Sequence, residues 1–141
     1  MSCMTAPVFV DTNVLLYATD VDVSDAAKSR VAYEILNRPD LALSVQVLQE
    51  FYWQATRAGR SGSLTHDRVR LFVESMDRYP IQEVTFGVVV AALALVERYR
   101  ISYWDAAIVA AAKALGCTEL LSEDLSDGQD YDGVVVRNPF A

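Results

Sequence analysis

The feature that most constrains this chain is an apolar stretch near its start that three polar residues interrupt. Val8-Phe9-Val10 is short, β-branched and aromatic, which is typical of a buried strand. Asp11, Thr12 and Asn13 follow at once, and residues 14–17 return to apolar types that can open a helix. Asp11 is therefore expected at the carboxyl end of a first strand, where open α/β sheets bind their ligands. The alternative is that Asp11 or Thr12 only caps the helix that follows.

The rest of the chain alternates short apolar strands with amphipathic helices. Ser24, Thr85 and Ser102 are expected helix caps, and Gly116 is an expected C-terminal stop. Strands then precede helices in a pattern that favours a mostly parallel sheet covered on both faces. We therefore predict an α/β fold, a single three-layer domain over residues 1–141. The predicted strands are 8–10, 41–44, 81–84, 118–122 and 134–136, an acidic loop covers 123–133, and the predicted helices are 24–37, 45–58, 65–78, 86–99 and 103–115.

Composition narrows the function classes. The chain has 141 residues, 52% of them hydrophobic, which indicates a compact core rather than disorder. Its net charge of −7 excludes binding of nucleic acid by general electrostatic attraction, so a polyanion would need a local basic patch or bound cations. Cys3 and Cys117 are expected to be reduced thiols, and with His66 they do not form a zinc pattern. No leader is expected, and the longest apolar run, 86–96, is too short to span a bilayer, so a soluble cytoplasmic protein is expected.

Four acids stand among apolar residues without a basic residue within one helical turn: Asp11, Glu50, Asp105 and Asp124. Each has an ordinary alternative. Glu50 can be a surface residue, Asp105 can form a capping box with Ser102, and Asp124 can bond the backbone of its own turn.

Taken together, the four acids indicate a metal site. Asp11 and Asp124 follow strands whose carboxyl ends meet at one edge of a parallel sheet. Several carboxylates in one crevice repel each other unless cations hold them together, and an all-oxygen donor set suits Mg²⁺ or Mn²⁺. Such ions can lower the pKa of a bound water and stabilise a leaving oxygen, which suits phosphodiester hydrolysis. No serine–histidine pair or phosphate-binding loop offers another nucleophile or phosphate site.

The pattern resembles a PIN domain, specifically the VapC-type toxin ribonucleases of toxin–antitoxin pairs. The resemblance spans the chain and is carried by Val10-Asp11-Thr12-Asn13, Gln49-Glu50, Tyr103-Trp104-Asp105-Ala106 and Leu121-Ser122-Glu123-Asp124. It implies a Mg²⁺- or Mn²⁺-dependent endoribonuclease that an antitoxin inhibits and that forms a homodimer. It also implies that Asp11, Glu50, Asp105 and Asp124 bind the metal and that Asn13 and Ser122 are auxiliary. The acidic loop after Asp124 is longer than in this family, which leaves the role of Asp127 and the number of ions open.

The RNA contact is the least determined part of the site. Arg57, Arg60 and Arg68, with His66 and Arg70, form the one basic stretch, which can contact phosphates or simply face solvent. Tyr52 and Trp53 can stack on bases, or they can belong to the core or a dimer contact. Residues 86–96 form either a buried helix or part of a subunit interface.

Three other classes of protein fit the sequence less well than a PIN-domain nuclease. A haloacid-dehalogenase-like phosphatase requires a second acid two residues after the first, where this chain has Asn13. A receiver domain requires a lysine after a late strand, where this chain has Ser122-Glu123. A PIN-like module that only binds a partner protein would tolerate the loss of one acid, and all four are present. The sequence does not identify the RNA, the cleaved position or the antitoxin.

Overall fold

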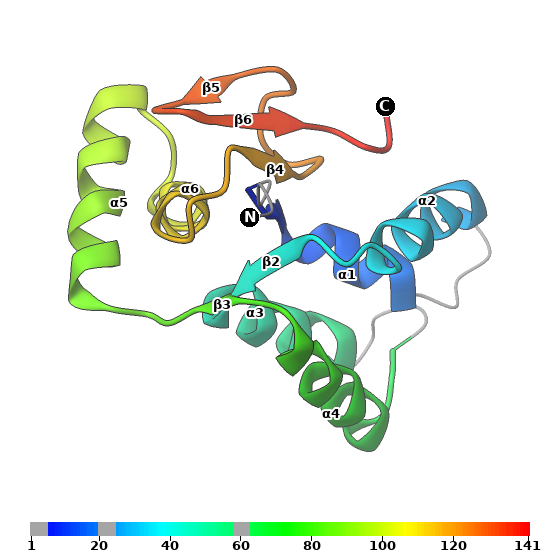
Figure 1. The fold of residues 1–141 in the computed structure, drawn as a ribbon. Coiled ribbons are helices and arrows are strands. Elements are labelled where there is room, and N and C mark those ends of the chain that lie inside the picture. The colour runs from blue at the N-terminus through cyan, green and yellow to red at the C-terminus, as the bar shows by residue number, and fades with distance from the viewer. Residues whose placement is uncertain (1–5, 20–24, 58–62) are drawn as a thin grey trace, which may run out of the picture.

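The computed structural model describes residues 6–19, 25–57 and 63–141 as an α/β fold built around one sheet (Figure 1). Within these ranges the strand order is β3-β2-β1-β4-β6-β5, and each neighbouring pair is parallel except β5 with β6. This confirms the predicted fold class. The strands are β1 (Val8–Val10), β2 (Leu41–Ser44), β3 (Ile81–Gln82), β4 (Glu119–Leu121), β5 (Asp130–Tyr131) and β6 (Val134–Arg137).

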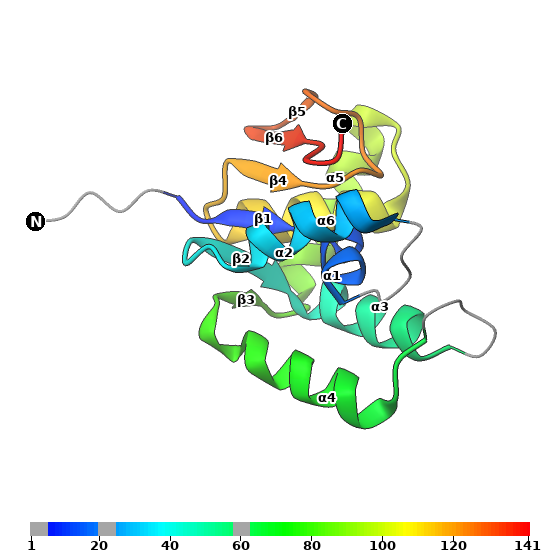
Figure 2. The same cartoon turned by 90° about the vertical axis from the view of Figure 1, so that its right-hand side faces the viewer.

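Helices cover both faces of the sheet. Figures 1 and 2 show α1 and α2 on one side, α5 and α6 on the other, and α3 and α4 beside the β3 end. The helices are α1 (Thr12–Thr19), α2 (Ala26–Leu36), α3 (Val45–Thr56), α4 (His66–Ser75), α5 (Phe86–Tyr99) and α6 (Tyr103–Ala114), and a 3-10 turn, Met76–Arg78, follows α4. None of them is both long and apolar enough to cross a bilayer in the part of the chain that the structure describes.

The core fills the space between the sheet and the helices on both of its faces. All three residues of β1 are buried, as expected for a central parallel strand with a helix layer on each face. On α6, residues 106–112 are buried and mostly alanine, so the helix can pack closely across β2, β4 and β6. Helix α5 packs on α6 and lies further from the sheet (Figure 1).

The predicted caps locate two helices correctly. Thr85 Oγ1 accepts a hydrogen bond from the backbone N–H of Val88, and Ser102 Oγ accepts one from Asp105, so α5 and α6 begin where the sequence indicated. Gly116, with a φ of 76°, follows the end of α6 in a left-handed conformation that suits glycine. The Ser24 cap and residue Ala58 lie outside the described residues, and so does Cys3. Cys117 is buried and free.

Several predicted boundaries are wrong. Helix α1 begins at Thr12 rather than near Val14, so Asp11 directly precedes it. The predicted helix 65–78 is divided into α4 and the 3-10 turn, and the strands at 81–84 and 118–122 are shorter than expected. The acidic loop 123–133 contains β5, which the sequence analysis missed. Asp132 and Gly133 have φ values of 54° and 97° and make the tight Asp-Gly turn of a hairpin between β5 and β6.

Candidate active site

The site forms where β1 and β4 end side by side. Val10 is in register with Leu121, and the Asp11 backbone N–H donates to the Leu121 carbonyl at 3.0 Å. The next residue of each strand, Asp11 and Ser122, therefore lies at the same edge of the sheet. This confirms the predicted meeting of the two strand ends.

Ser122 connects three parts of the site, and its side chain is fully buried. Its hydroxyl donates to Asp11 Oδ2 at 2.7 Å. The same oxygen accepts from Asn13 Nδ2 at 3.2 Å and from the backbone N–H of Asp124 at 3.1 Å. One hydroxyl thus fixes Asp11, orients Asn13 and begins the turn that carries Asp124.

Asn13 joins the two strand-end acids. Its Nδ2 also donates to Asp124 Oδ2 at 3.2 Å, so Asp11 and Asp124 are linked through Ser122 and Asn13. Its Oδ1 is buried and has no hydrogen-bond partner among the described residues. A buried acceptor without a donor is costly, and it marks a place where a ligand or a cation can be accommodated.

Glu50 is connected to the same centre from α3. Thr12 Oγ1 donates to Glu50 Oε2 at 3.1 Å, and Gln46 Nε2 donates to Glu50 Oε1 at 3.1 Å. Neither donor was predicted from the sequence. The spacing of Gln46 and Glu50, four residues on one helix, was a usable signal for their contact. Thr12 gave no such signal, because its partner is 38 residues away.

Asp105 is the acid that the hydrogen-bond network leaves out. It lies in the first turn of α6, half-buried, and its backbone N–H donates to the Ser102 hydroxyl. Its carboxylate makes no hydrogen bond to another described residue. The backbone carbonyl of the neighbouring residue, Trp104, accepts a hydrogen bond from Gln46 Nε2 at 3.4 Å. Among the described residues, no three acids, histidines or cysteines stand close enough together to form a ready metal site.

Burial makes the ionised form of Asp11 unfavourable. Desolvation is the main cause that raises the pKa of Asp11 from 3.8 to about 6, and the charges of Asp124 and Glu50 add to it. Hydrogen bonds from Ser122 and from the Thr12 backbone act in the opposite direction. No cation among the described residues contributes. A hard divalent ion beside Asp11 would supply that missing charge, and carboxylate and amide oxygens are ligands that such ions accept.

The loop that carries Asp124 is held at two further points. Glu123 accepts hydrogen bonds from the Tyr17 hydroxyl and from Lys28 Nζ, so α1 and α2 both hold it. Lys28 Nζ also lies 5.1 Å from the centroid of the Tyr17 ring. Asp127 Oδ1 accepts from the backbone N–H of Asn138 at 2.9 Å. Asp127 therefore ties the loop to the C-terminal segment.

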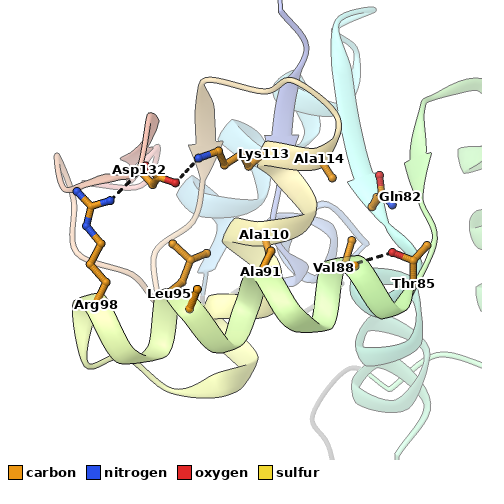
Figure 3. Close-up of a pocket in the computed structure, with 12 residues that line it drawn as sticks. Gln82, Thr85, Val88, Ala91, Leu95, Arg98, Ala110, Lys113, Ala114 and Asp132 are labelled. Atoms are coloured by element: carbon orange, nitrogen blue, oxygen red, sulfur yellow. Dashed lines mark hydrogen bonds and ion pairs between the residues drawn. The ribbon is translucent and has the colours of Figure 1, made fainter.

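Two hollows differ sharply in character. A cavity of about 330 Å³ adjoins the acids and is lined by polar residues that include Asn13, Gln54, Glu123 and Asp124. A larger groove of about 610 Å³ runs between α5 and α6, with apolar walls and a polar end where Arg98 and Lys113 both pair with Asp132 (Figure 3). None of the four predicted acids lines this groove. We place the candidate active site at the smaller cavity, because Asn13 and Asp124, which belong to the hydrogen-bond network of the buried Asp11, line it.

The predicted RNA-contact residues are only partly described. Arg57 follows α3 and lies exposed, and Arg68 is exposed in the first turns of α4, whereas Arg60 lies outside the described residues. Arg70 is paired with Glu74 on its own helix, and His66 Nδ1 is 2.9 Å from the Tyr52 hydroxyl. Tyr52 and Trp53 are exposed, so the alternative that they belong to the core is wrong.

Comparisons with known proteins agree with this architecture. The family model described as PIN domain matches residues 8–126. A toxin–antitoxin complex from Klebsiella pneumoniae aligns at 20% identity and a TM-score of 0.64, over 94% of this chain and 97% of that chain. DNA-bound VapBC from Salmonella typhimurium aligns at 16% identity and a TM-score of 0.64, over 96% and 99%. VapC20 from Mycobacterium tuberculosis, described as a sarcin-ricin loop cleaving toxin, aligns at 19% identity and a TM-score of 0.60, over 80% and 86%. No curated protein matches the chain.

Proposed function

The chain belongs to the PIN domain family, and from this premise we propose that it is a divalent-metal-dependent endoribonuclease, the toxin of a toxin–antitoxin pair. The observation that carries the proposal is the buried Asp11, which Ser122 and Asn13 join to Asp124 and which Thr12 places beside Glu50. A buried acid network at the carboxyl edge of a parallel sheet is a costly arrangement that a purely structural role does not require. The domain would extend over residues 1–141.

In this proposal Asp11, Glu50, Asp105 and Asp124 hold Mg²⁺ or Mn²⁺. When bound, such an ion makes a water nucleophilic and stabilises the charge that develops on the phosphate. Ser122 keeps Asp11 oriented by donating to it, and the buried Oδ1 of Asn13, which has no partner among the described residues, would be available as a further oxygen ligand. Asp105 would join the set from the first turn of α6, where the Trp104 carbonyl accepts a hydrogen bond from Gln46 of α3.

The proposed substrate and partners are supported by the chemistry of the site and by the proteins whose structures are similar. Structurally similar proteins include toxins in complex with antitoxins, and one is described as cleaving the sarcin-ricin loop. We propose RNA as the substrate, a cognate antitoxin as the inhibitor, a homodimer as the functional form and the cytoplasm as the location. Arg57 and Arg68 would contact RNA phosphates, and Arg60 stays a prediction.

A catalytically silent binding module is the second candidate. The observation that favours it is that no three of the described acids form a ready metal site. Titration with Mn²⁺ separates the two candidates: saturable binding that Asp11→Asn abolishes supports the nuclease, and no saturable binding supports the module. Membership of the PIN family removes the phosphatase alternative.

The direct test is cleavage of RNA by the purified protein. Cleavage is expected with Mg²⁺ or Mn²⁺ and not with EDTA, and Asp11→Asn should lower it by at least about a hundredfold while the fold is kept. Asp77→Asn is the matched control, because Asp77 is an exposed acid in the 3-10 turn and should leave cleavage unchanged. Undiminished cleavage by Asp11→Asn would contradict the proposal.

A further inference from the structure

Both tryptophans of the chain are exposed. Trp53 is 61% exposed and Trp104 is 64% exposed, although tryptophan is on average among the more buried residue types. Trp53 follows Glu50 by three residues on α3, and Trp104 directly precedes Asp105 on α6. Each large aromatic surface therefore stands beside one of the four proposed metal-binding acids.

One stripe of α3 connects the two tryptophans with the acids. Gln46, Glu50, Trp53 and Arg57 are separated by four, three and four residues, the spacing that places side chains on one face of a helix. At one end of the stripe, Gln46 Nε2 contacts both Glu50 Oε1 and the Trp104 carbonyl. The seven residues from Gln46 to Trp53 correspond to a helix rise of about 10 Å. Along the helix axis, Glu50 lies between Gln46 and Trp53.

The environment of the tryptophans favours planar, electron-rich ligands. The Arg57 guanidinium carbon lies 5.3 Å from the centroid of the Trp53 ring. The Trp104 ring meets Tyr103 edge-to-face, with centroids 5.1 Å apart. Aromatic faces beside a basic group are the usual platform for unpaired bases, and arginine adds a cation–π contribution.

We propose that Trp53 and Trp104 are stacking platforms for two unpaired bases that flank the phosphate to be cleaved. The inference rests on the proposed ribonuclease function and specifies its substrate: single-stranded RNA, a loop or a melted end. A base on Trp53 and a base on Trp104 hold the strand across Glu50, so the intervening phosphate faces the acids. The stacking tolerates different bases, because every base has a π-face.

The tryptophans report on this binding directly, since the chain has no others. The experiment titrates the full chain with a short oligoadenylate in Ca²⁺ and follows the tryptophan emission. The single strand is expected to quench the emission. An abasic strand of equal length, which offers only phosphates, and the oligoadenylate paired into a duplex should quench far less. Trp53→Ala and Trp104→Ala should each weaken binding about tenfold, within the range measured for a lost base stack, and Trp53→Phe should recover part of the loss.

Phe86→Ala is the matched control. Among the described residues, Phe86 is the most exposed large apolar residue, at 84%. It starts α5 beside the other hollow, so its loss should leave the affinity for oligoadenylate unchanged. Circular dichroism and thermal unfolding of each variant show whether the fold is kept. An alanine variant that unfolds is replaced by its phenylalanine counterpart, which must then show a smaller loss of affinity in the same direction.

The outcomes separate this inference from the proposed function. Quenching by the single strand in a protein that never cleaves RNA overturns the ribonuclease and leaves the base platforms standing. Cleavage without quenching, or with an affinity that both alanine variants leave unchanged, overturns the platforms. Equal quenching by duplex and single strand overturns them too, because contact would then be with phosphates alone. Emission that changes with protein concentration before RNA is added assigns the tryptophans to self-association instead.

Discussion

At the scale of single residues, the buried carboxylate of Asp11 is expected to lower the free energy of unfolding of the metal-free protein. Its raised pKa, about 6 against 3.8, means that the folded protein binds the Asp11 proton more tightly than the unfolded chain does. Stability from this group is therefore fully present below pH 3.8 and is lost as the pH rises through about 6. At neutral pH, Asp11→Asn should stabilise the metal-free protein by about 2–3 kcal/mol while it abolishes cleavage. Urea unfolding in EDTA at pH 5 and pH 8 measures the difference.

The stabilisation should be larger at pH 8 than at pH 5, since only the ionised carboxylate is penalised. A destabilised Asp11→Asn at pH 8 would contradict this account of Asp11. Asp77→Asn serves as the control, because it makes the same chemical change at an exposed acid.

Ser122→Ala removes one hydroxyl that three groups use. The backbone N–H of Asp124 and the Asn13 amide lose an acceptor, and Asp11 loses a donor. We expect a loss of about 1–3 kcal/mol of stability, the usual cost of buried polar groups left without partners, and a further rise in the pKa of Asp11. Chemical denaturation and the pH dependence of unfolding check both. Ser126→Ala, at an exposed position in the same loop, should change neither.

The sequence was sufficient for the residues whose role follows from position along the chain. Asp11 and Asp124 follow buried apolar strands, and parallel strands end at one edge, so their meeting could be predicted. Thr12 and Gln46 could not be assigned in advance, since their contacts depend on how α1 and α3 approach each other. The side-chain distance of Asp105 from the other acids depends on the same packing.

At the scale of elements, helices α1 and α2 act together on the loop that carries Asp124. Tyr17 and Lys28 both hold Glu123, the residue before it. Tyr17→Phe should let the loop open more often, with amide hydrogen exchange at Asp124 about fivefold faster, for the loss of a hydrogen bond of about 1 kcal/mol. Mass spectrometry or NMR of the metal-free protein measures it. Unchanged exchange at Asp124 would show that the Tyr17 hydroxyl does not help to hold the loop.

Element boundaries were predictable where a cap and a period agreed. Thr85 before an apolar helical run defined α5 correctly at both ends. Strand β5 was missed because its two residues, Asp130 and Tyr131, are too few to show a period. The Asp132-Gly133 turn was the signal that could have revealed the hairpin. Whether a two-residue strand forms depends on its turn and its partner strand, so it can hardly be predicted from its own two residues.

At the scale of the whole molecule, the net charge of −7 sets how RNA can bind. With only a few arginines beside the site, few condensed ions are released, so affinity for single-stranded RNA in Ca²⁺ should fall with KCl at a logarithmic slope of about −1 to −2. Titrations at several KCl concentrations give the slope. A slope much steeper than this would mean that a basic surface, rather than stacking and divalent ions, holds the RNA.

The C-terminal segment has a practical consequence for anyone who handles this protein. Phe140 packs edge-on against Tyr17, with ring centroids 4.8 Å apart, and the Asn138 backbone is bonded to Asp127. A purification tag fused directly after Ala141 would disturb the segment 138–141, whose contacts hold the acidic loop in place. Under the proposed toxin function, this disturbance would lower ribonuclease activity, so an expression host would tolerate the tagged protein better than the untagged one. A tag at the N-terminal end would avoid this loss of activity.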